Sequence, residues 1–226
     1  MEKLADDIWV HEDEIMVGGS KLGLRMTVVR LAEDKLWVHS PTTISDTLIE
    51  EVNNLGEVAC IVGPNNAHNL FLMEWRSAYP QAQLYVSKGI PKKLKLTDGF
   101  TPLQADFNNI WEEDLAWAYL PGFSVFDESV FLHKKSKSLI VTDYIQNYEG
   151  IEPTFIQKFI LGPIGFKGIC IAPPLKLGFL HKDKAGYGEA LTRVEQWQFE
   201  RIIVTHGDII DDDAMATFTR LSSRFT

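Results

Sequence analysis

The sequence predicts an α/β fold of four layers, an αββα sandwich in which two β-sheets face each other and helices cover the outer side of each. Two observations lead to this prediction. The first half of the chain alternates short apolar strands with amphipathic helices, and the second half brings a further group of strands together with helical segments. No repeat or linker interrupts the chain of 226 residues, which is long enough for one large domain. We therefore expect a single domain over residues 1–226.

The first half of the chain opens with β-structure. Residues 26–31 are rich in β-branched side chains, and a polar turn separates them from the apolar run 35–39, as in an antiparallel hairpin. A helix follows that Thr43 or Ser45 can cap and that Gly56 ends. The next expected elements are a strand at 57–62, a helix at 68–78 and a strand at 83–86.

The second half contains the strands that would form the other sheet. We expect strands at 115–120, 129–133, 138–142 and 199–205, and helices at 151–161, around 189–197 and from about 212 onward. A polar turn joins 129–133 to 138–142, which predicts a second hairpin.

Composition excludes several classes of partner. The net charge is −9 and the one local basic run is 91–95, whereas nucleic-acid binding needs a clustered basic face, so we expect no nucleic-acid partner. Cys60 and Cys170 lie in apolar runs and form no C-x-x-C motif, which indicates buried free thiols. The acidic N-terminus lacks an apolar signal segment, and no run approaches the roughly 20 apolar residues of a membrane span. We expect a reduced, cytoplasmic protein without a membrane partner.

Three stretches end strands with polar residues in a recurring order. Residues 61–68 read IVGPNNAH, residues 138–143 read SLIVTD, and residues 202–207 read IIVTHG. Their order and spacing resemble the metallo-β-lactamase superfamily, in which the first stretch carries H-x-H-x-D-H and the others end in Gly-Asp and Gly-His-Gly. The resemblance covers nearly the whole chain and implies the αββα fold of that superfamily. The chain is most similar to an uncharacterised subfamily with a degraded H-x-H-x-D-H motif.

The departures from the family pattern concern its first metal ion. Gly63 and Asn65 stand where the family has the first two histidines, and Phe123 stands where a Pro-Gly-His turn supplies the third. Ala67 replaces the aspartate of the motif. The resemblance therefore implies that the first metal is absent.

The family ligands that remain are His68, Asp143 and His206. Two imidazoles and one carboxylate can hold one divalent ion, such as zinc, iron or manganese, and leave positions open for water or substrate. The resemblance then implies a mononuclear metal-dependent hydrolase of an ester, lactone or phosphoester, acting through metal-bound water. The alternative is a metal-free, non-catalytic relic of the fold that binds a small molecule or a protein partner, with the buried histidine and aspartate bonded to each other.

Four further side chains are candidates for the surroundings of this site. Glu128 and His133 lie on one hairpin and could pair to orient a ligand, or form a surface ion pair. His39 ends a strand that points toward the expected site edge. Asn65 could contact a pocket through its amide, or shape a turn or helix cap.

Overall fold

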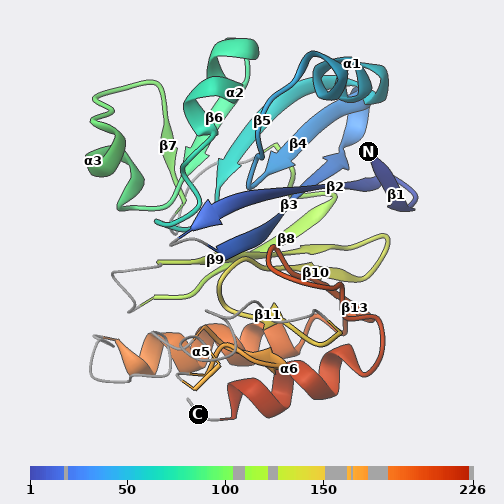
Figure 1. Ribbon diagram of the computed structural model, residues 1–226, viewed down its shortest axis with the longest axis vertical. Helices are drawn as coiled ribbons and strands as arrows, with labels where there is room; N and C mark the ends of the chain where they lie inside the picture. The colour runs from blue at the N-terminus through green and yellow to red at the C-terminus, as the bar shows by residue number, and fades with distance from the viewer. Residues whose placement is uncertain are drawn as a thin grey trace.

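The computed structural model confirms the αββα architecture. It describes residues 1–17, 20–103, 110–121, 127–150, 162–163, 165–172 and 183–223. Two sheets lie face to face, with one group of helices above the first sheet and another below the second, so that four layers follow each other from top to bottom in Figure 1. The expected helix 151–161 lies outside the described residues.

The first sheet contains seven strands whose spatial order follows their order in the chain. They are β1 (Glu2–Ala5), β2 (Ile8–Val17), β3 (Ser20–Arg30), β4 (Lys35–His39), β5 (Glu57–Gly63), β6 (Gln83–Val86) and β7 (Thr101–Pro102). The strands from β1 to β4 are antiparallel, and those from β4 to β7 are parallel. The predicted hairpin of 26–31 and 35–39 is the β3–β4 pair, whose connection is a short 3-10 helix, η1 (Ala32–Asp34).

The second sheet has four strands in the order β13, β10, β9 and β8. Their bounds are β8 (Leu115–Tyr119), β9 (Ser129–His133), β10 (Ser138–Ile140) and β13 (Arg201–Ile203). The strands β8, β9 and β10 are antiparallel neighbours, while β10 and β13 are parallel. A separate pair, β11 (Gln146–Asn147) and β12 (Ile169–Cys170), is antiparallel.

Within the part of the chain that the structure describes, five α-helices cover the outer faces of the two sheets (Figure 1). They are α1 (Asp46–Leu55), α2 (Leu72–Ala78), α3 (Ile90–Leu94), α5 (Lys184–Glu195) and α6 (Ala214–Ser222). Of the two predicted caps of α1, Ser45 is the one used, because its hydroxyl accepts the backbone N–H of Leu48 at 3.2 Å. None of the described helices is long and apolar enough to cross a bilayer.

Alternation of side chains along the strands divides the interior into three hydrophobic cores. In β4, Leu36 and Val38 face the helices α1 and α2, while Trp37 points between the sheets. There Trp37 meets Phe131 of the second sheet edge to face, with ring centroids 4.8 Å apart. The third core lies between the second sheet and the helices α5 and α6. Cys60 and Cys170 are buried free thiols, as predicted.

Helix α2 begins at Leu72, four residues later than the sequence pattern predicts. The side chains of Asn65 and Asn69 are the cause. Asn65 Oδ1 accepts the N–H groups of Ala67 and His68, and Asn69 Nδ2 donates to the carbonyls of Asn66 and Ala67. These bonds hold residues 65–69 in a compact turn that competes with helix formation.

The inter-sheet core predicts a large cost for removing an aromatic ring. Phe131 is fully buried, so Phe131→Ala should lower the free energy of unfolding by about 3–5 kcal/mol. The matched control is Met16→Ala, at a side chain that is 65% exposed, which should change it by less than about 0.5 kcal/mol. Urea denaturation of both variants measures the difference, and equal stabilities would contradict the assignment of Phe131 to the core.

Candidate functional site

The candidate site lies at one edge of the sandwich, where parallel strands end. The carboxyl ends of β4, β5 and β6 share this edge of the first sheet, and β10 and β13 end in parallel in the second. Polar side chains in segments that follow such strand ends are the usual ligand contacts of open α/β sheets. His68 follows β5, Asp143 follows β10 and His206 follows β13.

These three side chains converge on one point, as the sequence predicts. His68 Nε2 lies 3.3 Å from Asp143 Oδ2, and His206 Nε2 lies 3.6 Å from Asp143 Oδ1. One potential ligand atom from each residue lies within 4.8 Å of the other two. The side chains are only 7–8% exposed. Their role as metal ligands stays a prediction.

Each imidazole is oriented by a hydrogen bond from its other nitrogen. His206 Nδ1 lies 2.8 Å from the carbonyl oxygen of Gly23 on β3. A carbonyl can only accept, so Nδ1 carries the proton and Nε2 faces Asp143. His68 Nδ1 lies 2.7 Å from the hydroxyl of Ser40. Such bonds fix the tautomer and direction of metal-binding histidines in proteins.

The Asp143 carboxylate is ionised despite its burial. Burial raises the pKa of this carboxyl group, but the charges and hydrogen bonds of His68 and His206 oppose burial and hold the pKa well below its usual range. Burial conversely lowers the pKa of His206, and the neighbouring Asp143 raises it above the ordinary value. The amides of Asn65 and Gln146 each donate to one carboxylate oxygen at 2.8 Å. Each oxygen of the Asp143 carboxylate therefore accepts a hydrogen bond from one amide and faces one histidine.

Glu128 holds the turn that carries Asp143. Its two oxygens accept the backbone N–H groups of Thr142, Asp143 and Tyr144 at 2.7, 2.9 and 2.8 Å. The amide of Val141 still bonds the carbonyl of Ile203 on β13, and from Thr142 onward the backbone amides bond the Glu128 side chain instead of a neighbouring strand. Burial raises the pKa of Glu128 to about 7, and the charge of Asp143 adds to the effect.

The predicted pairing of Glu128 with His133 is wrong. The two side chains form neither a pair that orients a ligand nor an ion pair at the surface. Glu128 precedes β9 and His133 ends it, so the extended strand, at about 3.3 Å per residue, holds them at opposite ends. His133 Nδ1 lies 2.7 Å from the hydroxyl of Ser136 in the hairpin turn. Both side chains are buried, which excludes a surface ion pair.

Asn65 takes the turn role of the two that its sequence context left open, and its amide bonds other buried side chains instead of lining either pocket. Its Nδ2 donates to Asp143 Oδ2 and to the hydroxyl of Thr142, both at 2.8 Å. Its Oδ1 accepts backbone N–H groups of the turn that ends at His68. The side chain is fully buried. Asn65 thus connects the segment of His68 to the segment of Asp143.

His39 is the last residue of β4, as predicted, and its ring lies on the interior side of the site. It is fully buried, stacks on Trp37 with ring centroids 5.0 Å apart and meets Phe131 edge to face at 5.5 Å. Neither of its ring nitrogens hydrogen-bonds to any described residue. Burial lowers the pKa of His39 well below its ordinary value, and nearby His68 lowers it further. His39 is therefore a neutral histidine.

Arg25 is a site residue that the sequence analysis missed. Its buried guanidinium donates from Nη1 to the carbonyls of Val204 and Gly207, at 2.5 and 2.6 Å, and from Nη2 to Glu12 at 2.5 Å. These bonds fasten the segment that carries His206 to β3. The available signal was an arginine within the apolar strand pattern, because a charge is rarely buried in a strand without a partner.

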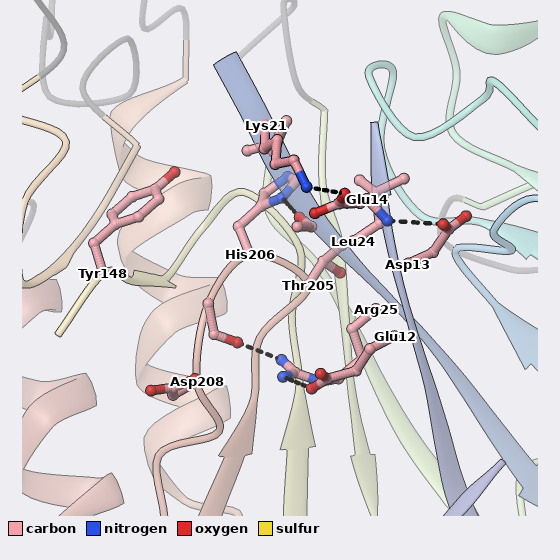
Figure 2. A pocket seen from close by; sticks show the side chains of 13 residues that line it. Glu12, Asp13, Glu14, Lys21, Leu24, Arg25, Tyr148, Thr205, His206 and Asp208 are labelled. Atoms are coloured by element: carbon pink, nitrogen blue, oxygen red, sulfur yellow. Dashed lines mark hydrogen bonds and ion pairs between the residues drawn. The ribbon is translucent and has the colours of Figure 1, made fainter. Parts of the chain in front are cut away.

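Two pockets open beside the three converging side chains. The apolar pocket, of about 390 Å3, has His68, Asp143 and His206 among its lining residues. Its apolar lining comes from the β2–β3 hairpin and from the segment that enters α2, namely Ile15, Leu22, Leu24, Leu70 and Phe71. The charged pocket, of about 340 Å3, shares His206 and contains Glu12, Asp13, Glu14, Lys21, Arg25, Tyr148 and Asp208 (Figure 2).

Comparisons with known proteins support the fold. Residues 5–166 match the model of a family described as a domain of unknown function (DUF4336). No curated protein matches the sequence. Among solved structures, TMB-1 is similar at a TM-score of 0.68 and 14% identity, over 99% of this chain and 96% of that chain.

Two further solved structures are described as metallo-β-lactamases. DIM-1 is similar at a TM-score of 0.67 and 15% identity, over 100% of this chain and 96% of that chain. FIM-1 from Pseudomonas aeruginosa, in its mono-zinc form, is similar at a TM-score of 0.66 and 13% identity, over 99% and 94% of the two chains. At these identities the likeness establishes the fold.

The burial of neutral His39 predicts a pH-dependent loss of stability. Its folded pKa lies below the ordinary value of 6.5, so the unfolded chain takes up the proton first and stability falls as the pH drops below about 6.5. The loss in the free energy of unfolding that is due to His39 approaches about 1.4 kcal/mol per pH unit. His39→Phe should remove this part of the slope between pH 6.5 and 5. Urea unfolding across this range tests it, and parallel curves for both proteins would contradict a neutral His39.

Gly207 should tolerate no side chain. Its φ is +94°, and a Cβ atom would lie 1.5 Å from the carbonyl oxygen of Asn147. We expect Gly207→Ala to cost at least about 3 kcal/mol of folding free energy. Gly188→Ala is the matched control, because a Cβ atom there has open space within α5 and should stabilise by about 0.5–1 kcal/mol. Thermal unfolding compares the two variants, and a fully stable Gly207→Ala protein would refute the tight contact.

Proposed function

This chain belongs to the family described as a domain of unknown function (DUF4336) and has the metallo-β-lactamase fold, and from that premise we propose that it is a metal-dependent hydrolase with a single-ion centre. The proposed ligands are His68, Asp143 and His206. Zinc is the first candidate, because two imidazoles and one carboxylate suit it, with iron and manganese as alternatives.

The spacing of the donor atoms carries this proposal. Two donors that each lie about 2.0–2.1 Å from a tetrahedral zinc ion are about 3.3–3.4 Å apart. The separations from Asp143 to the two Nε2 atoms are 3.3 and 3.6 Å. The longer one exceeds hydrogen-bond distance, although the two residues are buried side by side. Two of the three donor pairs thus have about the separation of atoms that share an ion, and all three donors lie within 4.8 Å of one another.

The protonation of His206 agrees with the same proposal. Gly23 fixes the proton of His206 on Nδ1, which leaves the Nε2 lone pair directed at a carboxylate. Two electron-rich atoms that face each other in a buried site need a cation or a proton between them. An ion held there would polarise a substrate oxygen and lower the pKa of a bound water.

The open side of the centre favours catalysis over a purely structural ion. Structural zinc sites use four protein ligands, whereas catalytic sites use three and keep one position free. Among the described residues, the cluster contains three ligands and lines the apolar pocket. FIM-1 was crystallised in a mono-zinc form, which indicates that a single zinc ion is compatible with this fold.

The replaced family ligands argue for one ion and no more. Gly63 offers no side chain, Ala67 offers no donor, and the amide of Asn65 is committed to Asp143 and Thr142. The same replacements favour the alternative, a metal-free protein whose pocket binds a ligand without chemistry. Binding of the ion distinguishes the two functions.

The proposal predicts stoichiometric metal binding. Protein purified without chelator and titrated with zinc should bind one ion per chain in calorimetry. Free zinc at 100 times the dissociation constant should then raise the free energy of unfolding by about 2.7 kcal/mol. His206→Ala should abolish binding, stabilisation and any ester, lactone or phosphoester hydrolysis together.

His133→Ala is the matched control, because His133 is a buried histidine at the far end of β9. It should bind zinc as the unaltered protein does. Retained turnover in His206→Ala, or the absence of any bound zinc, iron or manganese in the unaltered protein, would overturn the proposed function and leave the metal-free alternative.

A further inference from the structure

The two pockets that meet at His206 differ in the charge they offer to a ligand. In the charged pocket both basic side chains are already neutralised, since Lys21 pairs with Glu14 and Arg25 pairs with Glu12, each at 2.5 Å. Asp13 and Asp208 add further negative charge to the same walls. An anionic ligand group would be repelled there.

The apolar pocket offers a cation instead. Among its described lining residues, Lys93 on α3 is the one basic side chain besides the two histidines. Lys93 Nζ donates to the backbone carbonyl of Asn66 at 3.3 Å and takes part in none of the ion pairs of the described residues. Asp143, the one carboxylate among the described residues that line this pocket, faces the two histidines. An ammonium group has three protons to donate. Lys93 is therefore positioned for a single negatively charged group.

The remaining walls of this pocket are built for hydrocarbon. Leu22 and Leu24 from β3, together with Leu70 and Phe71 before α2, line it. Leu70 is 63% exposed, so its side chain is accessible to a ligand that enters the pocket. A volume of about 390 Å3 falls within the range of small-molecule sites.

We propose that the ligand of this site is an amphipathic monoanion, with an acyl-like hydrocarbon arm along Leu22, Leu24 and Leu70 and one anionic group at Lys93. The hydrolysis of this ligand rests on the proposed function, since the bond to be hydrolysed would lie at His68, Asp143 and His206. It narrows the substrate to carboxylic esters, lactones or related acyl compounds with one negative charge. Polyanions such as phosphodiester chains are excluded, because they need several cations along their path.

The test uses probes that do not depend on metal. The metal-free full-length protein is titrated by calorimetry with butane-1-sulfonate, octane-1-sulfonate and uncharged octanamide. A sulfonate reports on the anion site without the metal affinity of a carboxylate. Each methylene that enters the pocket should tighten binding about three- to fourfold. Octane-1-sulfonate should therefore bind much more tightly than butane-1-sulfonate.

Two variants separate the charge from the hydrocarbon wall. Lys93→Met should weaken the binding of octane-1-sulfonate about threefold to fivefold and leave the affinity for octanamide unchanged. Lys92→Met is the matched control, because Lys92 neighbours it on α3 but does not line the pocket, and it should bind both probes normally. Leu70→Ser, at an exposed position, should reduce the difference in affinity between the butane and the octane sulfonate.

The outcomes are distinguishable from those of the metal experiment. Equal binding of the butane and octane sulfonates, or equal effects of Lys92→Met and Lys93→Met, would overturn the ligand assignment even if one zinc ion binds. Chain-length-dependent binding that needs Lys93 would support it even if no metal is found, and only the hydrolase proposal would then fail.

Discussion

A carboxylate that leaves water must be compensated by charges or donors, and the buried carboxylate of Asp143 is compensated from both sheets. His68 and Asn65 reach it from the segment after β5 of the first sheet. His206 reaches it from the segment after β13 of the second. Because these contacts converge on one group, the position of Asp143 determines how the two halves of the sandwich meet at this edge. Removing that charge would leave two imidazoles without a common partner.

Two buried polar side chains, Asn65 and Glu128, connect the segments around Asp143. Asn65 stands where the family has a histidine, and it bonds the carboxylate and its own turn. Glu128 accepts three successive backbone amides around Asp143. Hydrogen bonds to a charged group are stronger than neutral ones and fix direction. The network thus fixes the position of Asp143 and of the turn that carries it.

The surroundings of the site divide into an anchoring side and a ligand-accepting side. On the anchoring side, β3 holds His206 through Gly23 and fastens its segment through Arg25. On the other side, the apolar pocket opens over the same three side chains. A rigid support behind the donors and an open, apolar space in front of them is the arrangement that precise positioning of a reacting group requires. Both sides draw on the β2–β3 hairpin.

The sequence by itself determined the layered fold, because strand periodicity and strand ends are local properties that the chain order carries. Its resemblance to the metallo-β-lactamase superfamily is what pointed to His68, Asp143 and His206. It left Asn65 with two roles and paired Glu128 with His133, although an extended strand separates two residues at its opposite ends by about 3.3 Å per residue. Only the tertiary structure decided that Glu128 bonds the turn of Asp143, that Arg25 fastens the segment of His206, and that Lys93 lines the apolar pocket. Arg25 and Val204 are 179 residues apart, and such contacts depend on packing between sheets, which no local pattern encodes.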